Sequence, residues 1–406
     1  MRFTREEYVS RWDKVHLEME RRGFEIAVIW QRSGGSFDRA GNVLWLTDYS
    51  SPSSGQEQPF WGGFGAAFSA LIMRLGYEPE LHVAENLDGI PDGAVAAGEM
   101  FQHDNLAKGV ALRVLALGRT QRICSVGDDT LPSDGYRMLI EAAPDIEWVP
   151  CENLLTRPQL IKSPAELDAY RIAGDIASRA LTELMEALIA GEPESEAAAR
   201  AAGVIMRAGG GFQRICTHHG PLSRKQMWSD PFYSFSTESP TPGDLLRGWV
   251  YGPLHKGYWI DPGRTAVCGN NPTLAQKRVI ENCIMVVEAV MQATKPGATA
   301  GEVGLIGDAA ARQAGWFDNE QGIALWPVYG HGTGSFWQPP ITVSGEMATL
   351  IDPELNLRDE PYKPGMVISS EFFLTDSEAG TATFEQNFIV TENGQELLTT
   401  TPTIWW

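Results

Sequence analysis

Cysteine is scarce and unpatterned in this sequence. The 406 residues include 5 cysteines, an odd number, and no two of them form a C-x-x-C pair. Disulfide frameworks and thiolate metal sites depend on such paired spacings. We therefore expect reduced thiols, no cysteine-bound metal and a cytoplasmic location.

Long apolar runs and nucleotide-binding loops are also missing. No stretch approaches the roughly 18 consecutive apolar residues of a membrane helix, and the first residues lack the apolar core of a signal peptide. Neither a Gly-x-Gly-x-x-Gly nor a Walker-type loop is present. These absences argue against a membrane partner, a leader and a nucleotide cofactor.

Basic residues are outnumbered by acidic ones. The chain has 32 Lys and Arg against 52 Asp and Glu, which gives a net charge of −20. A surface of this charge repels nucleic acids and anionic membranes. We therefore expect neither as a partner, whereas a pocket for a small-molecule substrate is compatible with this charge.

The length exceeds what one ordinary core supports, so two domains are expected, residues 1–155 and 160–406. The first domain alternates strands and helices, which is typical of an α/β domain. Its expected strands are Ile26–Trp30, Val43–Thr47, Ala66–Met73, Glu80–Ala84 and Arg122–Val126, and its expected helices include Leu106–Leu117 and Gly135–Ala143. The second domain reads as helices packed on antiparallel strands, an α+β arrangement.

Two glutamates are predicted to oppose each other near the C-terminus. Residues 376–380 read as a turn between the apolar runs 366–374 and 381–390. This hairpin places Glu371 opposite Glu385, with Cβ atoms about 5 Å apart. Carboxylates that close repel, so they need a cation, a shared proton or water between them.

A second hairpin is predicted from residues 248–254 and 257–267, in which Asp261 faces Val250. A metal site would favour a carboxylate opposite Asp261, and valine provides none. The segment Gly-His-Gly around His331 adds an imidazole. One Asp, one His and two Glu would suit a divalent ion such as Mn, Fe, Co or Zn.

These residues lie in segments that resemble the M24 family of prolidases, aminopeptidases and creatinase, which share the "pita-bread" fold. The matching segments are Arg157-x4-Lys162-Ser163-x2-Glu166, Pro242-Gly243-Asp244, Gly257-Tyr258-x2-Asp261-x2-Arg264-Thr265, Gly330-His331-Gly332-x-Gly334, Gly365-Met366-Val367-x3-Glu371, and Glu385 before Val390-Thr391-x2-Gly394. The resemblance covers roughly residues 160–400. It implies a C-terminal pita-bread domain, a creatinase/prolidase-type N-terminal domain and a homodimer.

The resemblance also implies metal ligands. Asp261, His331, Glu371 and Glu385 fall on four of the five ligand positions of the two-metal members, and Val250 stands at the fifth. This departure implies at most one well-held metal ion, and operation without metal is the alternative.

The resemblance further suggests residues that contact substrate. The metallopeptidases place a second histidine seven residues after the first, where this chain has Gln338. We expect Gln338, its neighbour Trp337 and Arg264 to bind substrate. Two histidines in a predicted loop are further candidates, His218 for substrate binding and His219 for catalysis.

The motifs of other branches are incomplete. Creatinase-like members use a glutamate where Gly263 stands and a histidine where Phe232 stands. The sulfoniopropionate lyases use an acid where Trp337 stands. We therefore expect a hydrolase of a small amide-like C–N bond, with Glu371 and His331 as catalytic residues. A lyase acting on a small carboxylate-bearing substrate and a catalytically silent binding protein are the alternatives.

Overall fold

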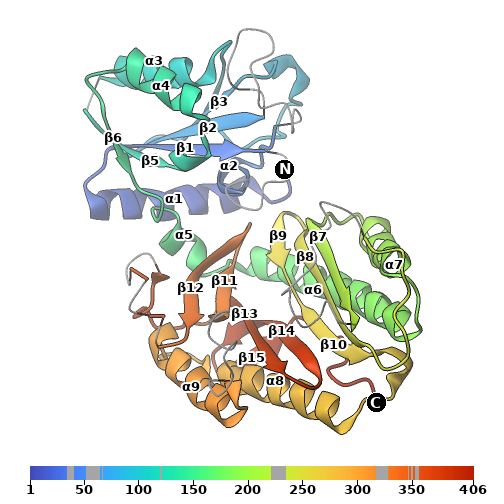
Figure 1. Ribbon diagram of the computed structural model, residues 1–406. Coiled ribbons are helices and arrows are strands. Elements are labelled where there is room, and N and C mark those ends of the chain that lie inside the picture. The colour runs from blue at the N-terminus through green and yellow to red at the C-terminus, as the bar shows by residue number, and fades with distance from the viewer. Residues whose placement is uncertain are drawn as a thin grey trace. The chain divides into compact units, whose positions relative to one another are not determined.

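The computed structural model describes residues 1–33, 41–51, 65, 67–118, 121–220, 235–316, 328–345, 347–348, 351–352 and 356–406. The chain divides into two compact units, Met1–Gln159 and Leu160–Trp406 (Figure 1). Among the described residues, no helix combines the length and apolar character needed to cross a bilayer.

The first unit is a mixed sheet with helices on both faces. Its strand order is β4-β3-β2-β1-β5-β6, for β1 (Ile26–Arg32), β2 (Phe68–Arg74), β3 (Glu80–Val83), β4 (Glu99–Gln102), β5 (Arg122–Val126) and β6 (Glu147–Pro150). Helices α1 (Arg5–Arg22) and α2 (Asn42–Thr47) pack on one face, and α3 (Leu106–Leu117) and α4 (Ser133–Ala142) pack on the other. The α/β prediction for this part of the chain is confirmed.

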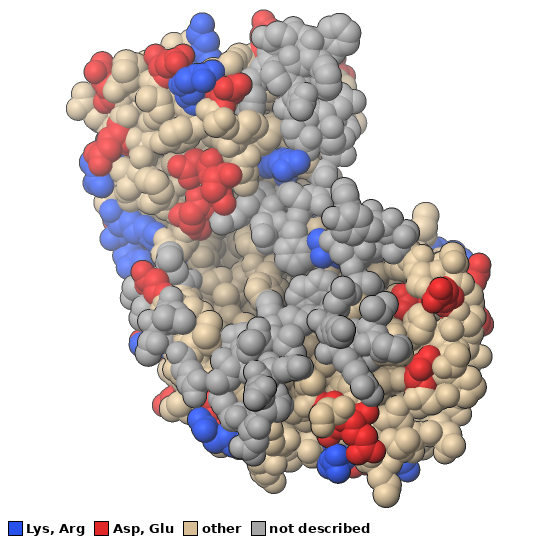
Figure 2. Space-filling view, in the orientation of Figure 1, with Lys and Arg blue, Asp and Glu red and all other residues tan. Residues whose placement is uncertain are grey.

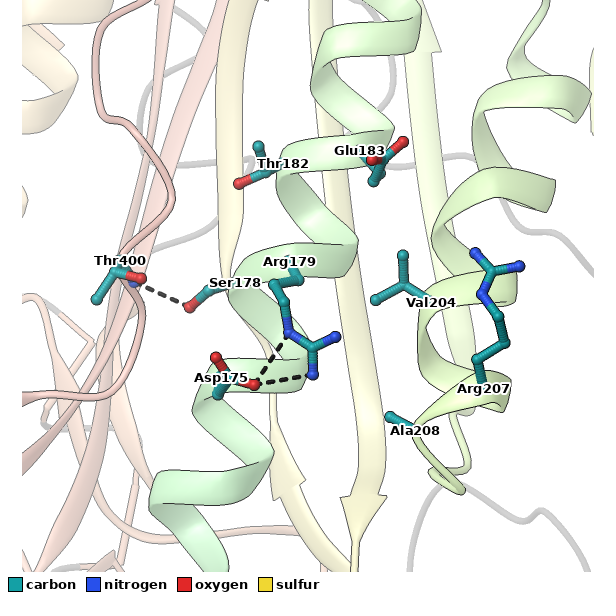
Figure 3. A pocket seen from close by; sticks show the side chains of 9 residues that line it. All are labelled: Asp175, Ser178, Arg179, Thr182, Glu183, Val204, Arg207, Ala208 and Thr400. Atoms are coloured by element: carbon teal, nitrogen blue, oxygen red, sulfur yellow. Dashed lines mark hydrogen bonds and ion pairs between the residues drawn. The ribbon is translucent and has the colours of Figure 1, made fainter.

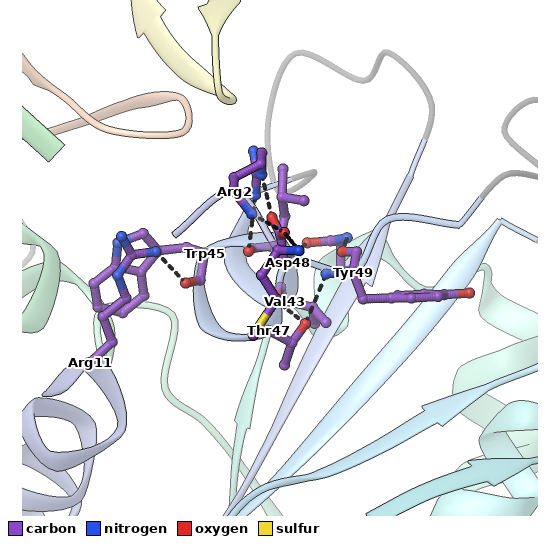
Figure 4. A network of polar contacts seen from close by, with 10 residues as sticks. Arg2, Arg11, Val43, Trp45, Thr47, Asp48 and Tyr49 are labelled. Carbon is purple, nitrogen blue, oxygen red and sulfur yellow. Dashed lines mark hydrogen bonds and ion pairs between the residues drawn. The ribbon is translucent and has the colours of Figure 1, made fainter. Parts of the chain in front are cut away.

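The predicted strand Val43–Thr47 is wrong, because these residues form helix α2. A short apolar run does not distinguish a buried strand from a buried helix. Here Arg11 donates to the carbonyl of Trp45 at 2.7 Å, and the side chain of Arg2 bonds Asp48, the residue that ends α2 in the left-handed conformation (Figure 4). Contacts with α1, and with Arg2 just before α1, thus stabilise α2 as a helix.

The second unit is built on a nine-stranded sheet of order β12-β11-β13-β14-β10-β8-β7, with β15 beside β14 and β9 beside β8. The strands are β7 (Arg214–His219), β8 (Leu245–His255), β9 (Tyr258–Ile260), β10 (Gly263–Val267), β11 (Val328–Thr333), β12 (Trp337–Val343), β13 (Val367–Asp376), β14 (Gly380–Thr391) and β15 (Gly394–Leu397). All pairings in it are antiparallel, so the α+β prediction is confirmed.

Helices cover one face of this sheet. Helix α6 (Pro164–Ile189) packs on β8 beside α7 (Glu194–Arg207), and α8 (Leu274–Ala293) packs on β13 and β14 beside α9 (Ala300–Gln313). Helix α5 (Thr156–Leu160) precedes them. On β13, Phe372 and Leu374 join the core with α8, so alternation directs Glu371 to the opposite face.

The predicted C-terminal hairpin is confirmed. The Asp376 side chain accepts hydrogen bonds from the backbone N–H groups of Glu378 and Ala379, which closes the turn. The register that follows pairs Glu371 with Glu385. Both carboxylates therefore lie side by side on adjacent strands.

The second predicted hairpin exists with a different register. Lys256 and Gly257 have φ angles of 50° and 81°, as in a type I′ turn, so the turn lies one residue later than predicted. A β-bulge between Pro253 and His255 also shifts the pairing, so that Gly252 pairs with Ile260. The Val250 N–H then bonds the carbonyl of Pro262 at 3.3 Å, and the prediction that Asp261 faces Val250 is wrong. The predicted loop around the two adjacent histidines is strand β7.

Candidate metal centre

Three buried side chains converge in the second unit. One ligand atom from each of Asp261, His331 and Glu385 lies within 4.8 Å of the other two. Asp261 stands between β9 and β10, whereas His331 lies on β11 and Glu385 on β14. The order of the strands thus assembles ligands that are far apart in the sequence.

His331 directs one ring nitrogen into this cluster. Its Nδ1 lies 3.0 Å from the carbonyl of Gly332, which can only accept, so Nδ1 carries a proton. Its Nε2 lies 3.3 Å from Oδ2 of Asp261. The same nitrogen lies 3.8 Å from Oε1 of both Glu371 and Glu385. In the neutral imidazole, Nε2 is then the nitrogen able to bind a metal.

Neutral donors orient Asp261. The Trp259 indole N–H donates to Oδ2 at 3.0 Å, and the Asn387 amide donates to Oδ1 at 2.6 Å. Hydrogen bonds of this kind fix the direction of a metal-ligating carboxylate. The carboxylate is therefore held in place before any ion binds.

Glu385 is held in a similar way. The Ser369 hydroxyl donates to its Oε1 at 2.8 Å, and the Trp249 side chain donates a second hydrogen bond. The indole reaches Glu385 across strand β10, where Gly263 pairs with both residues. A Cβ atom on Gly263 would lie 2.2 Å from Nε1 of Trp249, so glycine makes room for the ring.

The electrostatics of the cluster favour a cation. Burial, and then the charge of Asp261, raise the pKa of Glu385 well above its usual value. Burial alone would raise the pKa of Asp261 too, but His331 and the hydrogen bonds outweigh it and the pKa is lowered. Burial would lower the pKa of His331, whereas Asp261 and Glu371 raise it. A metal ion would neutralise this excess of negative charge.

The described residues offer one set of ligands that is consistent with a single metal ion. Asp261, His331 and Glu385 supply two oxygens and one nitrogen, a set that suits a hard or borderline divalent ion. Val250 is buried and has no ligand atom, and the Trp249 indole contacts Glu385.

Of two predicted substrate residues, Trp337 lies beside the cluster, and Gln338 follows it on β12. The Trp337 ring packs on His331 with 4.3 Å between ring centres, and it is half-buried. The Gln338 side chain is buried, and neither polar atom of its amide has a hydrogen-bond partner in the described part of the chain. Both positions suit contact with a bound molecule.

The guanidinium of Arg264 binds backbone carbonyls and a neighbouring amide, and substrate binding by this residue stays a prediction. Its buried guanidinium donates to the carbonyl of Glu385 at 2.6 Å, the side chain of Gln386 at 2.6 Å and the carbonyl of Thr401 at 3.1 Å. It thereby ties β14 to the C-terminal segment.

The two adjacent histidines face opposite sides of β7. His219 Nδ1 lies 2.6 Å from Glu194 on α7, and the catalytic role expected for His219 stays a prediction. His218 instead contacts Arg247 on β8. Phe232, where creatinase-like members have a histidine, lies outside the described residues.

Sequence reasoning did not identify the residues that orient the ligands. Ser369 and Asn387 each lie two residues from a glutamate of the hairpin, so strand alternation would have placed them on the same face. Trp259 also lies two residues from its ligand, Asp261. Trp249 gave no such signal, because its contact depends on the pairing of separate strands.

A surface pocket of about 550 Å³ lies elsewhere in the second unit, between α6 and α7 (Figure 3). Its polar groups are engaged with one another: Arg179 pairs with Asp175 at 2.8 Å, and Ser178 accepts from the Thr400 N–H at 2.9 Å. It shares no residue with the cluster.

The surface in Figure 2 carries several separate groups of Asp and Glu, in keeping with the net charge of −20.

Comparisons with known proteins agree with this geometry. The model of metallopeptidase family M24 matches residues 168–392, which is more than half of the chain. An ectoine hydrolase of Halomonas elongata is 22% identical over 98% of this chain and 97% of its own length. A probable dipeptidase PepE of Mycobacterium tuberculosis is 29% identical over 60% of this chain and 59% of its own length.

Solved structures share the fold. A dipeptidase from Pyrococcus horikoshii superimposes with a TM-score of 0.75 at 18% identity, over 97% of this chain and 98% of that one. The matched family segment contains Asp261, His331, Glu371 and Glu385. The chain belongs to metallopeptidase family M24.

Proposed function

We propose that this chain is a hydrolase that cleaves an amide-like C–N bond of a small substrate with the help of one divalent metal ion. The observation that carries the proposal is the convergence of Asp261, His331 and Glu385 within 4.8 Å, beside the carboxylate of Glu371. The names of the relatives, an ectoine hydrolase and a dipeptidase, support hydrolysis as the reaction class.

The side chains divide into ligands and a base. Asp261, His331 and Glu385 would hold the ion, which when bound polarises a carbonyl and lowers the pKa of water. Glu371 is the general base: it takes a proton from the attacking water and delivers it to the leaving nitrogen. Because Glu371 pairs with Glu385 across the two strands, its carboxylate lies beside the three ligands.

Trp337 and Gln338 bind the substrate in this proposal. The indole of Trp337 closes one side of the cluster by packing on His331. The buried amide of Gln338 offers one acceptor and two donor hydrogens, and a substrate amide can satisfy both kinds of group.

We further propose a cytoplasmic homodimer whose first unit is a creatinase/prolidase-type domain. All five cysteines are unbridged and buried, which suits a reducing compartment. The dimer and the domain type rest on the resemblance to two-domain family members. The acidic surface supports a small molecule, rather than nucleic acid or a membrane, as the partner.

The test compares Glu371→Gln with Glu378→Gln, an exposed glutamate in the turn of the same hairpin. Metal-loaded protein is incubated with a panel of N-acyl amino acids and dipeptides, and amine release is measured. We expect release by the wild type and Glu378→Gln, and a loss of about 10²- to 10⁴-fold in Glu371→Gln. An unsaturated product would instead identify a lyase, and no turnover of any compound would contradict the proposal.

A further inference from the structure

Strands β10 and β14 join two parts of the nine-stranded sheet, and the candidate metal centre spans this junction. Asp261 precedes β10, whereas His331 lies on β11 and Glu385 on β14. In the described part of the chain, the backbones of β10 and β14 pair at one position, Gly263 with Glu385. By comparison, β13 and β14 pair at ten positions. The backbone ladder between β10 and β14 therefore stops on either side of Gly263.

A side chain replaces the backbone hydrogen bonds on one side of this pair. If the register of Gly263 and Glu385 continued by two residues, Thr265 would pair with Thr383. Instead the Thr265 hydroxyl donates to the Thr383 carbonyl at 2.8 Å and accepts from the Thr383 N–H at 2.8 Å. One buried hydroxyl thus meets both backbone groups of Thr383 and sets the distance between the two strands.

The same replacement occurs on the other side of the pair, at a metal ligand. The register would pair Asp261 with Asn387, and here the Asn387 amide accepts from the Asp261 N–H at 3.3 Å and donates to the Asp261 carboxylate at 2.6 Å. At the pair itself, the Arg264 guanidinium donates to the Glu385 carbonyl at 2.6 Å. Thr265, Arg264 and Asn387 are all buried, so water does not compete for these hydrogen bonds.

We propose that Thr265 is a positioning residue of the metal centre, whose hydroxyl holds β10 and β14 at the separation that lets Asp261 and Glu385 bind the same ion. Metal–oxygen distances are about 2.0–2.2 Å and have little tolerance, so a change in strand separation weakens binding. Asn387 acts on the same junction but also contacts Asp261 directly, whereas Thr265 acts only through the strands. This inference rests on the proposed function and adds to it a residue that is not itself a ligand.

Metal affinity of the folded protein tests this role. Thr265→Val removes the hydroxyl, Thr265→Ser keeps it, and the control Thr381→Val removes a buried hydroxyl of β14 that bonds Thr375 rather than β10. Co²⁺ binding to the full-length proteins is followed by visible absorption and by competition with a chelator, below the unfolding transition of each variant. We expect Thr265→Val to bind Co²⁺ about 10-fold more weakly than the wild type, and Thr265→Ser and Thr381→Val to match the wild type.

A second measurement needs no metal. In ¹⁵N-histidine spectra of the metal-free proteins, the His331 signal, assigned with His331→Ala, should shift in Thr265→Val and stay in place in Thr381→Val, because the His331 ring contacts Asp261 across the junction. If the valine variant does not fold, Thr265→Cys replaces it. A thiol is a weaker donor and acceptor than a hydroxyl, so we again expect weaker Co²⁺ binding and a shifted His331 signal.

The outcomes separate this inference from the proposed function. Equal Co²⁺ affinity in the wild type and the Thr265 variant, or an equal loss in Thr381→Val, would overturn the positioning role. A wild type that binds no Co²⁺ would contradict the single-metal function. The His331 signal would then decide the role of Thr265, and a signal that stays in place in Thr265→Val would overturn it.

Discussion

The indole of Trp249 lies across Gly263 and donates its hydrogen bond to Glu385 on the next strand. The middle strand of the three, β10, must have a glycine at this position, because a Cβ atom on Gly263 would lie 2.2 Å from the ring nitrogen of Trp249. One tryptophan thus orients a metal ligand and occupies space beside it.

Replacing Gly263 by alanine should displace the indole. The added methyl overlaps Nε1 of Trp249, and overpacking of this kind costs about 1–3 kcal/mol of unfolding free energy. Urea unfolding measures the loss. Near-UV circular dichroism should also change, because the environment of the tryptophan changes.

The matched control for this prediction is Gly203→Ala on helix α7. There a Cβ atom would meet only the flexible end of Arg207, at 3.1 Å. Alanine is favoured over glycine within a helix by about 1 kcal/mol, so the control should be neutral or stabilised. An unchanged stability in Gly263→Ala would contradict the tight fit of the indole.

Gln338→Met should stabilise the protein and weaken substrate binding. The buried amide has no hydrogen-bond partner in the described ranges, and an unsatisfied buried polar group costs about 1–3 kcal/mol. Methionine has a similar shape without the amide. We expect a gain of about 1 kcal/mol in thermal or urea unfolding, together with a higher KM for amide substrates. A destabilised variant with an unchanged KM would show that Gln338 is a structural residue.

The acid stability of the first unit should depend on the pair of Glu80 and Arg113. Two hydrogen bonds of 2.7 Å join them. Burial alone would raise the pKa of Glu80, but Arg113 lowers it from 4.5 to about 2. Between pH 4.5 and 2 the unfolded state binds more protons than the folded state. The contribution of this pair to the free energy of unfolding is therefore complete above pH 4.5 and disappears as the pH falls towards 2.

Arg113→Met should remove most of this dependence, because His82 makes a further contribution to the lowered pKa of Glu80. Its stability should differ from the wild type by about 1 kcal/mol above pH 4.5, since the pair is partly exposed, and the difference should vanish near pH 2. Arg137→Met, which breaks an exposed pair with Asp134, is the control and should change little. A difference that is independent of pH would contradict the lowered pKa of Glu80.

The sequence predicted the parts of the fold that local chemistry determines. Helix α6 begins at Pro164 with a capping box between Ser163 and Glu166, which are only three residues apart. The turn that begins at Asp376 set the register of the C-terminal hairpin, and with it the opposition of two of the site's glutamates. In these cases the residues that decide the structure are close together in the chain.

Other features depend on long-range contacts and were missed. The run Val43–Thr47 is helical because it packs against residues of α1. Asp261 lies outside its predicted register because Lys256 and Gly257, rather than the preceding pair, form the turn. The role of Arg264 could not be predicted, because its partners on the C-terminal segment are more than 100 residues away.

Metal content per chain tests the central claim most directly. The wild type, His331→Ala and the control His219→Ala are purified without chelator, incubated with Mn, Fe, Co or Zn, desalted and measured by mass spectrometry. The cluster of Asp261, His331 and Glu385 predicts about one ion per chain in the wild type and the control, and none in His331→Ala. Two ions per chain, or no ion with any of the four metals, would contradict a single-metal centre.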